Sequence, residues 1–357
     1  MALNLETLGW DARRAEQFAP CAAQGLVPGR VAREHTHIYT VLSAAGEALA
    51  RVTGRFRHEA RGRQDYPAAG DWVALSSGGA PGGHLRIHAV LPRKSRFSRK
   101  VAGATAEEQV VAANVDTIFI VSALDRDFNL RRLERYLVVG RWSGARPVIV
   151  LSKTDLYDDV GAAVADVTAI AAEVPVHAVS GKSGEGLDAL GRYLVPGETI
   201  ALLGSSGVGK STLVNRLLGE ERQRTREVRP SDGRGRHATS SRELLVMPGG
   251  ALIIDTPGMR ELQLWETEEA IGETFDDIEA LAPACYFRDC QHGEEPRCAV
   301  KAAVAGGRID AGHLANYHKL KREMQALAAR QDPHAAQDAK RRWKTIAKAA
   351  IRHEPQE

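Results

Sequence analysis

Residues 204–211, GSSGVGKS, have the residue types and spacing of a phosphate-binding loop, G-x-x-x-x-G-K-[ST]. An apolar run at 199–203 precedes the loop, and a helix-forming stretch at 210–218 follows it. In that setting the glycines let backbone N–H groups converge on phosphate oxygens at a helix N-terminus. Lys210 would reach the β and γ phosphates, and Ser211 would ligate Mg²⁺. We therefore predict a nucleoside triphosphate site formed by Gly204, Ser205, Ser206, Gly207, Val208, Gly209, Lys210, Ser211 and Thr212.

The segment 151–156, LSKTDL, would choose the base, because a phosphate loop contacts only phosphates and metal. It resembles the [N/T]-K-x-D sequence of GTPases, with Ser152 where Asn or Thr is usual. The Asp155 carboxylate would accept hydrogen bonds from the guanine N1–H and 2-amino group, which adenine cannot donate, and Lys153 would lay its alkyl stem along the base. Leaving a buried acceptor without donors costs about 1–3 kcal/mol. By itself S-K-x-D also suits a surface turn, but together with a phosphate loop it indicates guanine.

Two further segments fit a guanine nucleotide. VSGKSGEGLDAL, at 179–190, resembles the S-A-K loop that buttresses guanine, with Ser180, Gly181 and Lys182 in the matching places and Gly181 replacing Ala. ALIIDTPG, at 251–258, is an apolar strand that ends in D-x-x-G. Asp255 would hold Mg²⁺ through water, and the Gly258 N–H would meet the γ-phosphate. Either segment alone is common by chance, whereas four such segments in one chain predict a GTP site.

The order of these segments is unusual, because both base-recognition segments precede the phosphate loop and D-x-x-G. Because the termini of a domain often lie close together, they can be joined and the chain can instead begin and end in another loop, and the sheet keeps its packing. The order therefore implies circular permutation. In these motifs the chain closely resembles the ribosome-small-subunit-dependent GTPase A family (RsgA, also called YjeQ). That resemblance implies an OB-fold before a permuted GTPase domain and a zinc domain after it.

The stretch 224–244 lies where a GTPase keeps its first switch. The family pattern here is G-R-G-R-H-T-T-T, and this chain has GRGRHATS at 233–240. Ala238 replaces the first threonine, so Thr239 is the best candidate to cap Mg²⁺ and the γ-phosphate, with Ser240 as the fallback. Met259 stands just after D-x-x-G, where many GTPases place a glutamine that orients water.

Because Met259 makes no useful hydrogen bond, we expect slow intrinsic turnover that rises when a partner orders the switch and supplies another polar group. His237 is the first choice for that group, although it would equally suit packing or RNA contact. The predicted catalytic residues are thus His237, Thr239 and Lys210.

Residues 285–298, CYFRDCQHGEEPRC, contain three of the four cysteines of the chain and one histidine. Three thiolates and one imidazole suit tetrahedral Zn²⁺ with no position left for water, so the metal would be structural. The stretch, including the following residues A-V, matches the zinc motif of the family. The predicted ligands are Cys285, Cys290, His292 and Cys298. Cys21 lies alone and needs no role.

The elements that would position these residues can be read from hydrophobic periodicity. Residues 30–92 show short β-type runs separated by Gly-rich turns, which suits an OB-fold-like or SH3-like barrel. From 115 to 254, apolar strands mostly alternate with helical stretches at 129–142, 159–173 and 210–218, the pattern of a parallel sheet covered on both faces. The strands are expected at 117–121, 147–151, 175–179, 199–203, 243–247 and 251–255.

We therefore predict a multidomain α/β protein. Its parts are an N-terminal extension at 1–29, an OB-like β-barrel at 30–100, a circularly permuted P-loop GTPase domain at 101–265, and a mostly helical zinc-binding domain with a basic tail at 266–357.

The formal net charge of +3 hides an uneven distribution. Residues 30–100 carry thirteen Lys/Arg against five Asp/Glu, and residues 311–357 carry ten against five. The stretch 101–310 carries twenty-three against thirty-two. Basic clusters next to a barrel are a plausible footprint for RNA, although a solvated surface explains such a run equally well. The resemblance favours RNA, with the barrel as the RNA-binding part.

No apolar segment is long enough to span a membrane, and Glu6, Asp11 and Glu16 stand where a signal peptide would be apolar. Sparse cysteine with a thiolate metal site favours a reducing compartment, so a cytoplasmic protein is expected. We also expect a monomer.

The resemblance implies a GTP-hydrolysing factor that binds the small (30S) ribosomal subunit and its 16S rRNA late in maturation, with GTP favouring docking and hydrolysis favouring release. Its cofactors would be GTP/GDP, Mg²⁺ and one structural Zn²⁺. Alternatives are a diverged paralogue that binds nucleotide and RNA without catalysis, and an ATP-dependent enzyme that uses the same phosphate loop.

Overall fold

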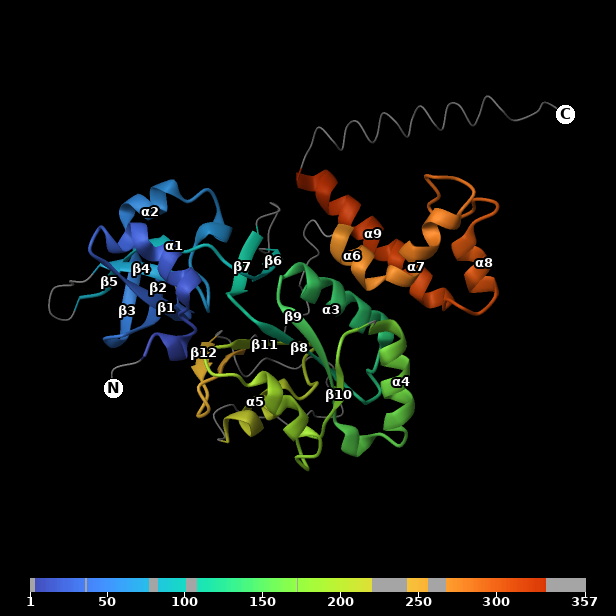
Figure 1. The fold of residues 1–357 in the computed structure, drawn as a ribbon, viewed down its shortest axis with the longest axis horizontal. Coiled ribbons are helices and arrows are strands. Elements are labelled where there is room, and N and C mark those ends of the chain that lie inside the picture. The colour runs from blue at the N-terminus through green and yellow to red at the C-terminus, as the bar shows by residue number, and fades with distance from the viewer. Residues whose placement is uncertain are drawn as a thin grey trace, which may run out of the picture. The chain divides into compact units, whose positions relative to one another are not determined.

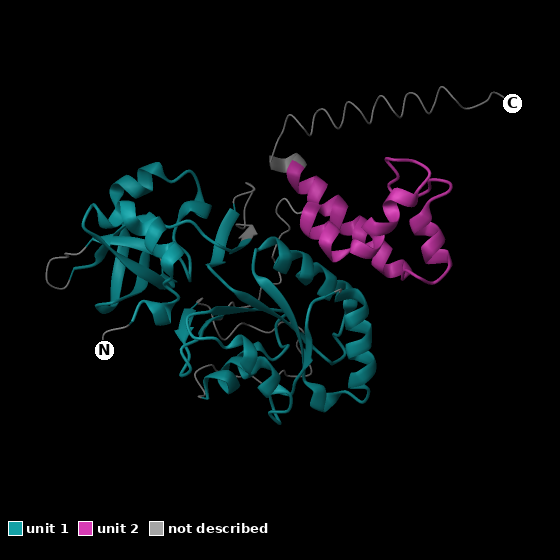
Figure 2. Ribbon diagram, in the orientation of Figure 1, with its two compact units in different colours: residues 1–102, 107–263 teal, residues 103–106, 264–357 magenta. Residues whose placement is uncertain are grey.

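The computed structural model describes residues 4–35, 37–76, 83–100, 108–171, 173–219, 243–255 and 268–331 (Figure 1). The chain forms two compact units (Figure 2). Unit 1 comprises residues 1–102 and 107–263, and unit 2 comprises residues 103–106 and 264–357. Each unit is described by itself below.

The first part of unit 1 is a five-stranded barrel. Its strands are β1 (Leu26–His35), β2 (Ile38–Ser43), β3 (Gly46–Val52), β4 (Trp72–Ser76) and β5 (Leu85–Val90). The pairings run β1–β2–β3–β5–β4 and return to β1, with β3 and β5 parallel and the other pairs antiparallel. This closed order is that of an OB-fold rather than an SH3-like barrel. Alternate residues of the strands, among them Val31, Val41 and Ile87, fill its interior.

Helices and short turns surround the barrel. They are η1 (Glu6–Leu8), α1 (Ala12–Ala22), α2 (Gly54–Glu59) and η2 (Arg63–Asp65). Sequence periodicity showed no helix between 30 and 92, but α2 forms there because the Thr53 side chain accepts a hydrogen bond from the Phe56 N–H and caps it. β1 begins four residues before the sequence-based boundary at residue 30, because its first residues, from Leu26 to Gly29, pair with β4. Gly29 lets Leu75 approach closely, since a Cβ there would lie 2.5 Å from Leu75 Cδ1.

The second part of unit 1 is a sheet with helices on both faces. Its elements are β8 (Thr117–Ala123), α3 (Leu130–Trp142), β9 (Arg146–Ser152), η3 (Thr154–Leu156), α4 (Val160–Ala171), β10 (Val176–Ala178), η4 (Leu187–Tyr193), β11 (Thr199–Leu203), α5 (Lys210–Leu218), β12 (Glu243–Val246) and β13 (Leu252–Asp255). The order β10–β9–β8–β11–β13 is parallel throughout. A separate two-stranded sheet, β6 (Arg96–Lys100) and β7 (Glu108–Ala113), precedes it in sequence.

Alternation along β8 explains how both faces are covered. Phe119 and Val121 belong to a core cluster that includes Leu213 and Val214 of α5. Ile118 and Ile120 point to the other face, where α3 packs so closely that a Cβ on Gly140 would lie 3.4 and 3.5 Å from their side chains. Because both faces are covered, β8 carries four consecutive buried apolar residues, Ile118 to Val121, instead of an alternating pattern.

β12 departs from the predicted parallel arrangement, because it runs antiparallel to β13. The two strands are joined by a tight turn in which the Met247 N–H donates to the Ala251 carbonyl at 2.8 Å, and a connection this short permits only antiparallel pairing. The outer edge of β12 pairs with β1 of the barrel, at Arg33 and Glu243. The barrel and the parallel sheet therefore share one continuous eleven-stranded sheet.

Unit 2 is helical, as predicted. It contains α6 (Glu268–Thr274), α7 (Asp276–Leu281), η5 (Ala282–Ala284), α8 (Ala299–Ala305) and α9 (Ala311–Gln331). Ile271, Phe275, Ile278, Val300 and Leu320 are fully buried in its core. In the described parts of both units, none of the helices combines the length and apolar character needed to cross a bilayer.

Candidate functional site

The predicted nucleotide-binding segments meet at one edge of the parallel sheet. LSKTDL follows β9, SGK follows β10, and the phosphate loop follows β11 (Figure 1). These strands lie in the same parallel sheet, so their carboxyl ends open on the same side. Open α/β sheets bind ligands outside that edge. The structure thus brings together segments that lie fifty residues apart in the sequence.

The phosphate loop has the backbone conformation that its glycines allow. Gly207 and Gly209 have φ values of 84° and 90°, in the left-handed region that side chains disfavour. A Cβ on Gly204 would lie 2.3 Å from the Val121 carbonyl oxygen of β8, so no side chain fits there. α5 begins at Lys210, directly after the loop. The Lys210 ammonium donates to the carbonyls of Gly204 and Ser205, at 2.8 and 2.7 Å, which places it within the curve of the loop.

Ser152 joins the base-recognition segment to the phosphate loop. Its hydroxyl lies 2.6 Å from the Val208 carbonyl oxygen, to which it donates, and 3.3 Å from that of Ser122. The side chain is buried, because β9 lies inside the sheet. A serine in this position is therefore long enough to bond the phosphate loop directly.

Asp155 is held by the loop after β10. The Ser180 hydroxyl donates to Asp155 Oδ1 at 2.6 Å and accepts from the N–H groups of Lys182 and Ser183. Asp155 is exposed, so its carboxylate is accessible to a ligand at this edge. The arrangement has the acceptor that guanine recognition requires, already oriented by a neighbouring hydroxyl.

Gly181 is explained by a close neighbour from α5. A Cβ in its place would lie 3.0 Å from Cγ2 of Thr212, tighter than ordinary van der Waals contact. The same loop is fixed by Arg216 of α5, whose Nε and Nη2 donate to the carbonyls of Gly181 and Lys182 at 2.9 and 2.7 Å. Thr212 therefore contributes packing beside the loop that would contact the base.

Two residues near the site were missed by sequence reasoning. Arg216 is one, and Asp125 is the other: its carboxylate accepts from the Lys153 ammonium at 2.8 Å. The signal for Asp125 was a carboxylate directly after the apolar run that forms β8. The pairing of Asp125 with Lys153 could be inferred from it only once β8 and β9 are known to be neighbouring strands.

The candidates for γ-phosphate and Mg²⁺ contact fall mainly outside the described residues. His237, Thr239, Gly258 and the departures Ala238 and Met259 lie there. The backbone of Asp255 ends β13, next to β11, and so reaches the same edge of the sheet as the phosphate loop. The roles of these residues remain predictions, as does Mg²⁺ ligation by Ser211.

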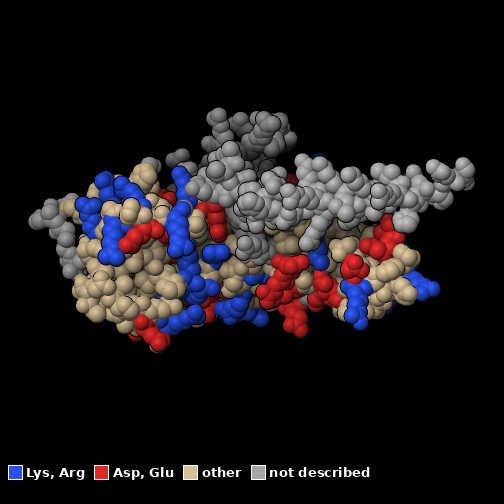
Figure 3. Space-filling view, turned by 90° about the horizontal axis from the view of Figure 1, so that it is seen from above, with Lys and Arg blue, Asp and Glu red and all other residues tan. Residues whose placement is uncertain are grey.

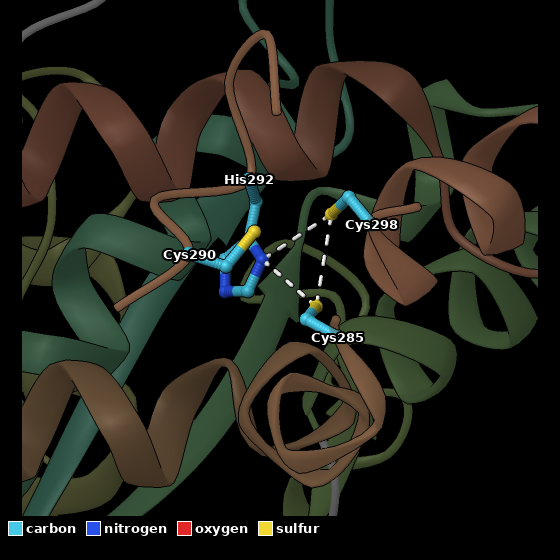
Figure 4. A group of neighbouring side chains, drawn as sticks. All are labelled: Cys285, Cys290, His292 and Cys298. Atoms are coloured by element: carbon cyan, nitrogen blue, oxygen red, sulfur yellow. Dashed lines mark hydrogen bonds between the residues drawn. The ribbon is translucent and has the colours of Figure 1, made fainter. Parts of the chain in front are cut away.

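The four predicted zinc ligands of unit 2 lie together (Figure 4). Their ligand atoms are all within 4.8 Å of one another, and the Cys285 and Cys298 sulfurs are 3.8 Å apart. Tetrahedral Zn²⁺ with Zn–S bonds of about 2.3 Å separates its sulfurs by about the same 3.8 Å. The Nδ1 atom of His292 lies 3.6 and 3.4 Å from these two sulfurs. The cluster fits one tetrahedral ion.

Local structure orients the cluster. Cys298 caps α8 through its sulfur, which accepts from the Lys301 N–H. His292 is buried and has φ 59°, a strained conformation for a residue with a side chain. Burial lowers the pKa of His292, so near pH 7 the imidazole is neutral, the form that coordinates metal. Donor set, spacing and protonation together make this a possible Cys₃His zinc site.

Comparisons with known proteins agree with this geometry. The model of the RsgA GTPase family matches residues 90–265. A small ribosomal subunit biogenesis GTPase RsgA from Opitutus terrae is 51% identical over 352 residues, covering 96% of each chain. The protein of the same name from Syntrophotalea carbinolica is 44% identical, again with 96% of each chain covered.

Among solved structures, YjeQ from Thermotoga maritima is 28% identical with a TM-score of 0.62, covering 84% of this chain and 99% of that one. YloQ, described as a circularly permuted GTPase, has a TM-score of 0.58 at 23% identity, covering 84% and 96%, and supports the fold. Motif order, sheet topology and sequence identity over nearly the whole chain lead to one conclusion. The chain belongs to the RsgA GTPase family.

Proposed function

We propose that this protein hydrolyses GTP and acts in biogenesis of the small ribosomal subunit, as the names of its relatives say of them. The observation that carries the proposal is the meeting of three loops at one sheet edge: LSKTDL, SGK and the phosphate loop. Ser152 of the first donates to the Val208 carbonyl of the phosphate loop, and Ser180 of the second donates to Asp155 of the first. Because bacterial ribosomal subunits are assembled in the cytoplasm, we expect the protein to act there.

The residues of the site would bind GTP in separate ways. Backbone N–H groups of 204–211 and the Lys210 ammonium would neutralise the phosphates, while Asp155 would accept hydrogen bonds from guanine. Mg²⁺, held by Ser211, Thr239 and Asp255, would supply charge neutralisation at the β and γ phosphates. These residues fix the nucleotide for attack by water, and His237 is the proposed group that orients it.

The proposed RNA-binding surface is the outside of the barrel. Of the thirteen basic residues at 30–100, Arg30 is buried, Arg93 pairs with Asp71, and Lys94 pairs with Asp116. Arg30 and Arg93 stabilise the fold and contribute little to an outer surface, whereas Lys94 remains exposed beside its ion pair. Figure 3 shows Lys and Arg side chains gathered over the barrel part of unit 1. The exposed basic residues on the strands and helices of the barrel part, and on the loop between α2 and η2, are Arg51, Arg55, Arg57, Arg61, Arg63 and Arg86.

These exposed arginines suit the phosphates of 16S rRNA. GTP would favour docking of the monomeric protein on the 30S subunit, and hydrolysis, slow until the subunit stimulates it, would favour release late in maturation. The permuted order supports a direct link: β13 ends at Asp255, at the sheet edge of the phosphate loop, and α6 of unit 2 begins thirteen residues later at Glu268.

Association with purified small subunits tests the proposed cycle. We expect the protein to cosediment with subunits at least about tenfold more tightly with a non-hydrolysable GTP analogue than with GDP, a coupling of typical size. An ATP analogue should have no effect. Equal affinity with GDP and the GTP analogue would contradict nucleotide-controlled docking. The non-catalytic alternative is tested separately, because such a protein would release no phosphate even with subunits present.

A further inference from the structure

Asp125 is a carboxylate at the nucleotide edge that none of the recognised motifs contains. It follows β8, the strand between β9 and β11. The last register pair of β8 and β9 joins Ala123 and Ser152, and the Leu124 N–H donates to the Ser152 carbonyl at 2.8 Å. The loop of Asp125 and the base-recognition segment therefore leave the sheet side by side.

The Asp125 carboxylate is oriented by its own loop. Its Oδ1 accepts from the Asp127 N–H at 3.0 Å, and its backbone carbonyl accepts from the Phe128 N–H at 2.9 Å. Its other oxygen, Oδ2, accepts from the Lys153 ammonium at 2.8 Å. Because the turn fixes the carboxylate, Asp125 is the anchor of this pair and Lys153 is the residue being held.

The alkyl stem of Lys153 can cover the base only when its long side chain is held in one position. Its backbone has φ 61° and ψ 37°, a left-handed conformation that residues other than glycine rarely adopt. Strain of this kind persists where the surroundings impose it, often at ligand sites. The long side chain would otherwise sample many rotamers, and fixing it only on binding would weaken affinity. The ion pair with Asp125 fixes the ammonium end of Lys153 before a nucleotide binds.

A second contact joins the same two loops. Phe128, three residues after Asp125, packs edge to face against Tyr157, with ring centroids 6.4 Å apart. The pairing of Lys153 with Asp125 is thus part of a two-point connection and not an isolated surface contact. Both side chains of the ion pair are less than one-third exposed.

We propose that Asp125 is a positioning residue for guanine nucleotides. Its carboxylate holds the Lys153 ammonium so that the alkyl stem of Lys153 is in place to cover the base that Asp155 selects. This inference rests on the proposed function and adds to it a residue that acts through Lys153. The alternative is an ordinary surface ion pair, which would contribute little to stability or to nucleotide affinity.

Asp125→Asn tests the proposal, because it keeps the shape and the acceptor for the Asp127 N–H while removing the charge. The dissociation constant for GDP should rise roughly fivefold, the effect of losing one partly buried ion pair. With small subunits present, KM for GTP should rise more than kcat falls. Asp127→Asn is the matched control, since that exposed carboxylate lies in the same loop, and it should leave GDP affinity unchanged. Asp125→Glu should restore part of the affinity.

A double-mutant cycle separates positioning from general destabilisation. In a Lys153→Ala background, Asp125→Asn should cause no further loss of GDP affinity, because the held side chain is gone. An equal loss in both backgrounds, or unchanged GDP affinity in the single variant, would overturn the inference while leaving the proposed function intact. Failure of the wild-type protein to bind GDP would overturn both.

Discussion

At the scale of single residues, the departures from the common GTPase motifs have local physical explanations. Ser152 replaces a longer side chain, yet its hydroxyl reaches the Val208 carbonyl at 2.6 Å because β9 ends close to the phosphate loop. Gly181 replaces alanine where a methyl group would crowd Thr212. Ser152 thus keeps a contact with the phosphate loop, and Gly181 leaves room for α5. The two departures therefore do not by themselves indicate a loss of nucleotide binding.

The Ser152 contact predicts the effect of its removal. Ser152→Ala leaves the buried Val208 carbonyl without this donor, which costs about 1 kcal/mol and should raise the dissociation constant for GDP roughly fivefold. Titration of a fluorescent GDP analogue measures the change. Ser183→Ala, in an exposed part of the neighbouring loop, is the control and should bind normally. Unchanged affinity in Ser152→Ala would show that the contact is dispensable.

At the scale of elements, the barrel and the parallel sheet are tied together by a buried cation. Arg30 of β1 is 1% exposed and donates to the carbonyls of Leu8, Gly70 and Asn114 and to the Thr199 hydroxyl at the start of β11. Burial lowers the pKa of Arg30 to about 10, so it is still charged at neutral pH. β1 also pairs with β12. The sheet edge and this side chain therefore fix the barrel against the strands that carry the site.

Removal of that cation should destabilise unit 1. Arg30→Met leaves several buried acceptors without a donor and should lower the free energy of unfolding by about 3 kcal/mol. Thermal unfolding followed by circular dichroism would show a lower midpoint. Arg51→Met, at an exposed position of β3, is the matched control and should unfold like the wild type. Equal midpoints for the two variants would mean that the network does not hold the parts together.

Elements with strong local signals could be predicted from the sequence, and elements defined by distant neighbours could not. β11 was expected at 199–203 and lies there, because an uninterrupted apolar run ends in a glycine-rich loop. The start of β1 was missed because Pro28 and Gly29 suggest a turn, and α2 is too short to show a period. The roles of Arg30 and Asp125 depend on strand order, which no local pattern encodes.

At the scale of the whole molecule, circular permutation changes which parts are neighbours in sequence. The base-recognition loops come first, the phosphate loop follows, and the strand that ends at Asp255 leads toward unit 2 with its Cys₃His cluster. The barrel strand β1 pairs with β12, the first described strand after the phosphate-loop helix. Under the proposed function, nucleotide state would be linked to the barrel through the β1–β12 pairing and to the Cys₃His unit along the chain after Asp255.

Release of phosphate tests the central claim most directly. The protein is incubated with GTP or ATP, each with and without purified small ribosomal subunits. We expect slow release from GTP alone, an increase of at least about tenfold with subunits, and no release from ATP under either condition. No release from GTP in the presence of subunits, or equal rates with GTP and ATP, would contradict the account.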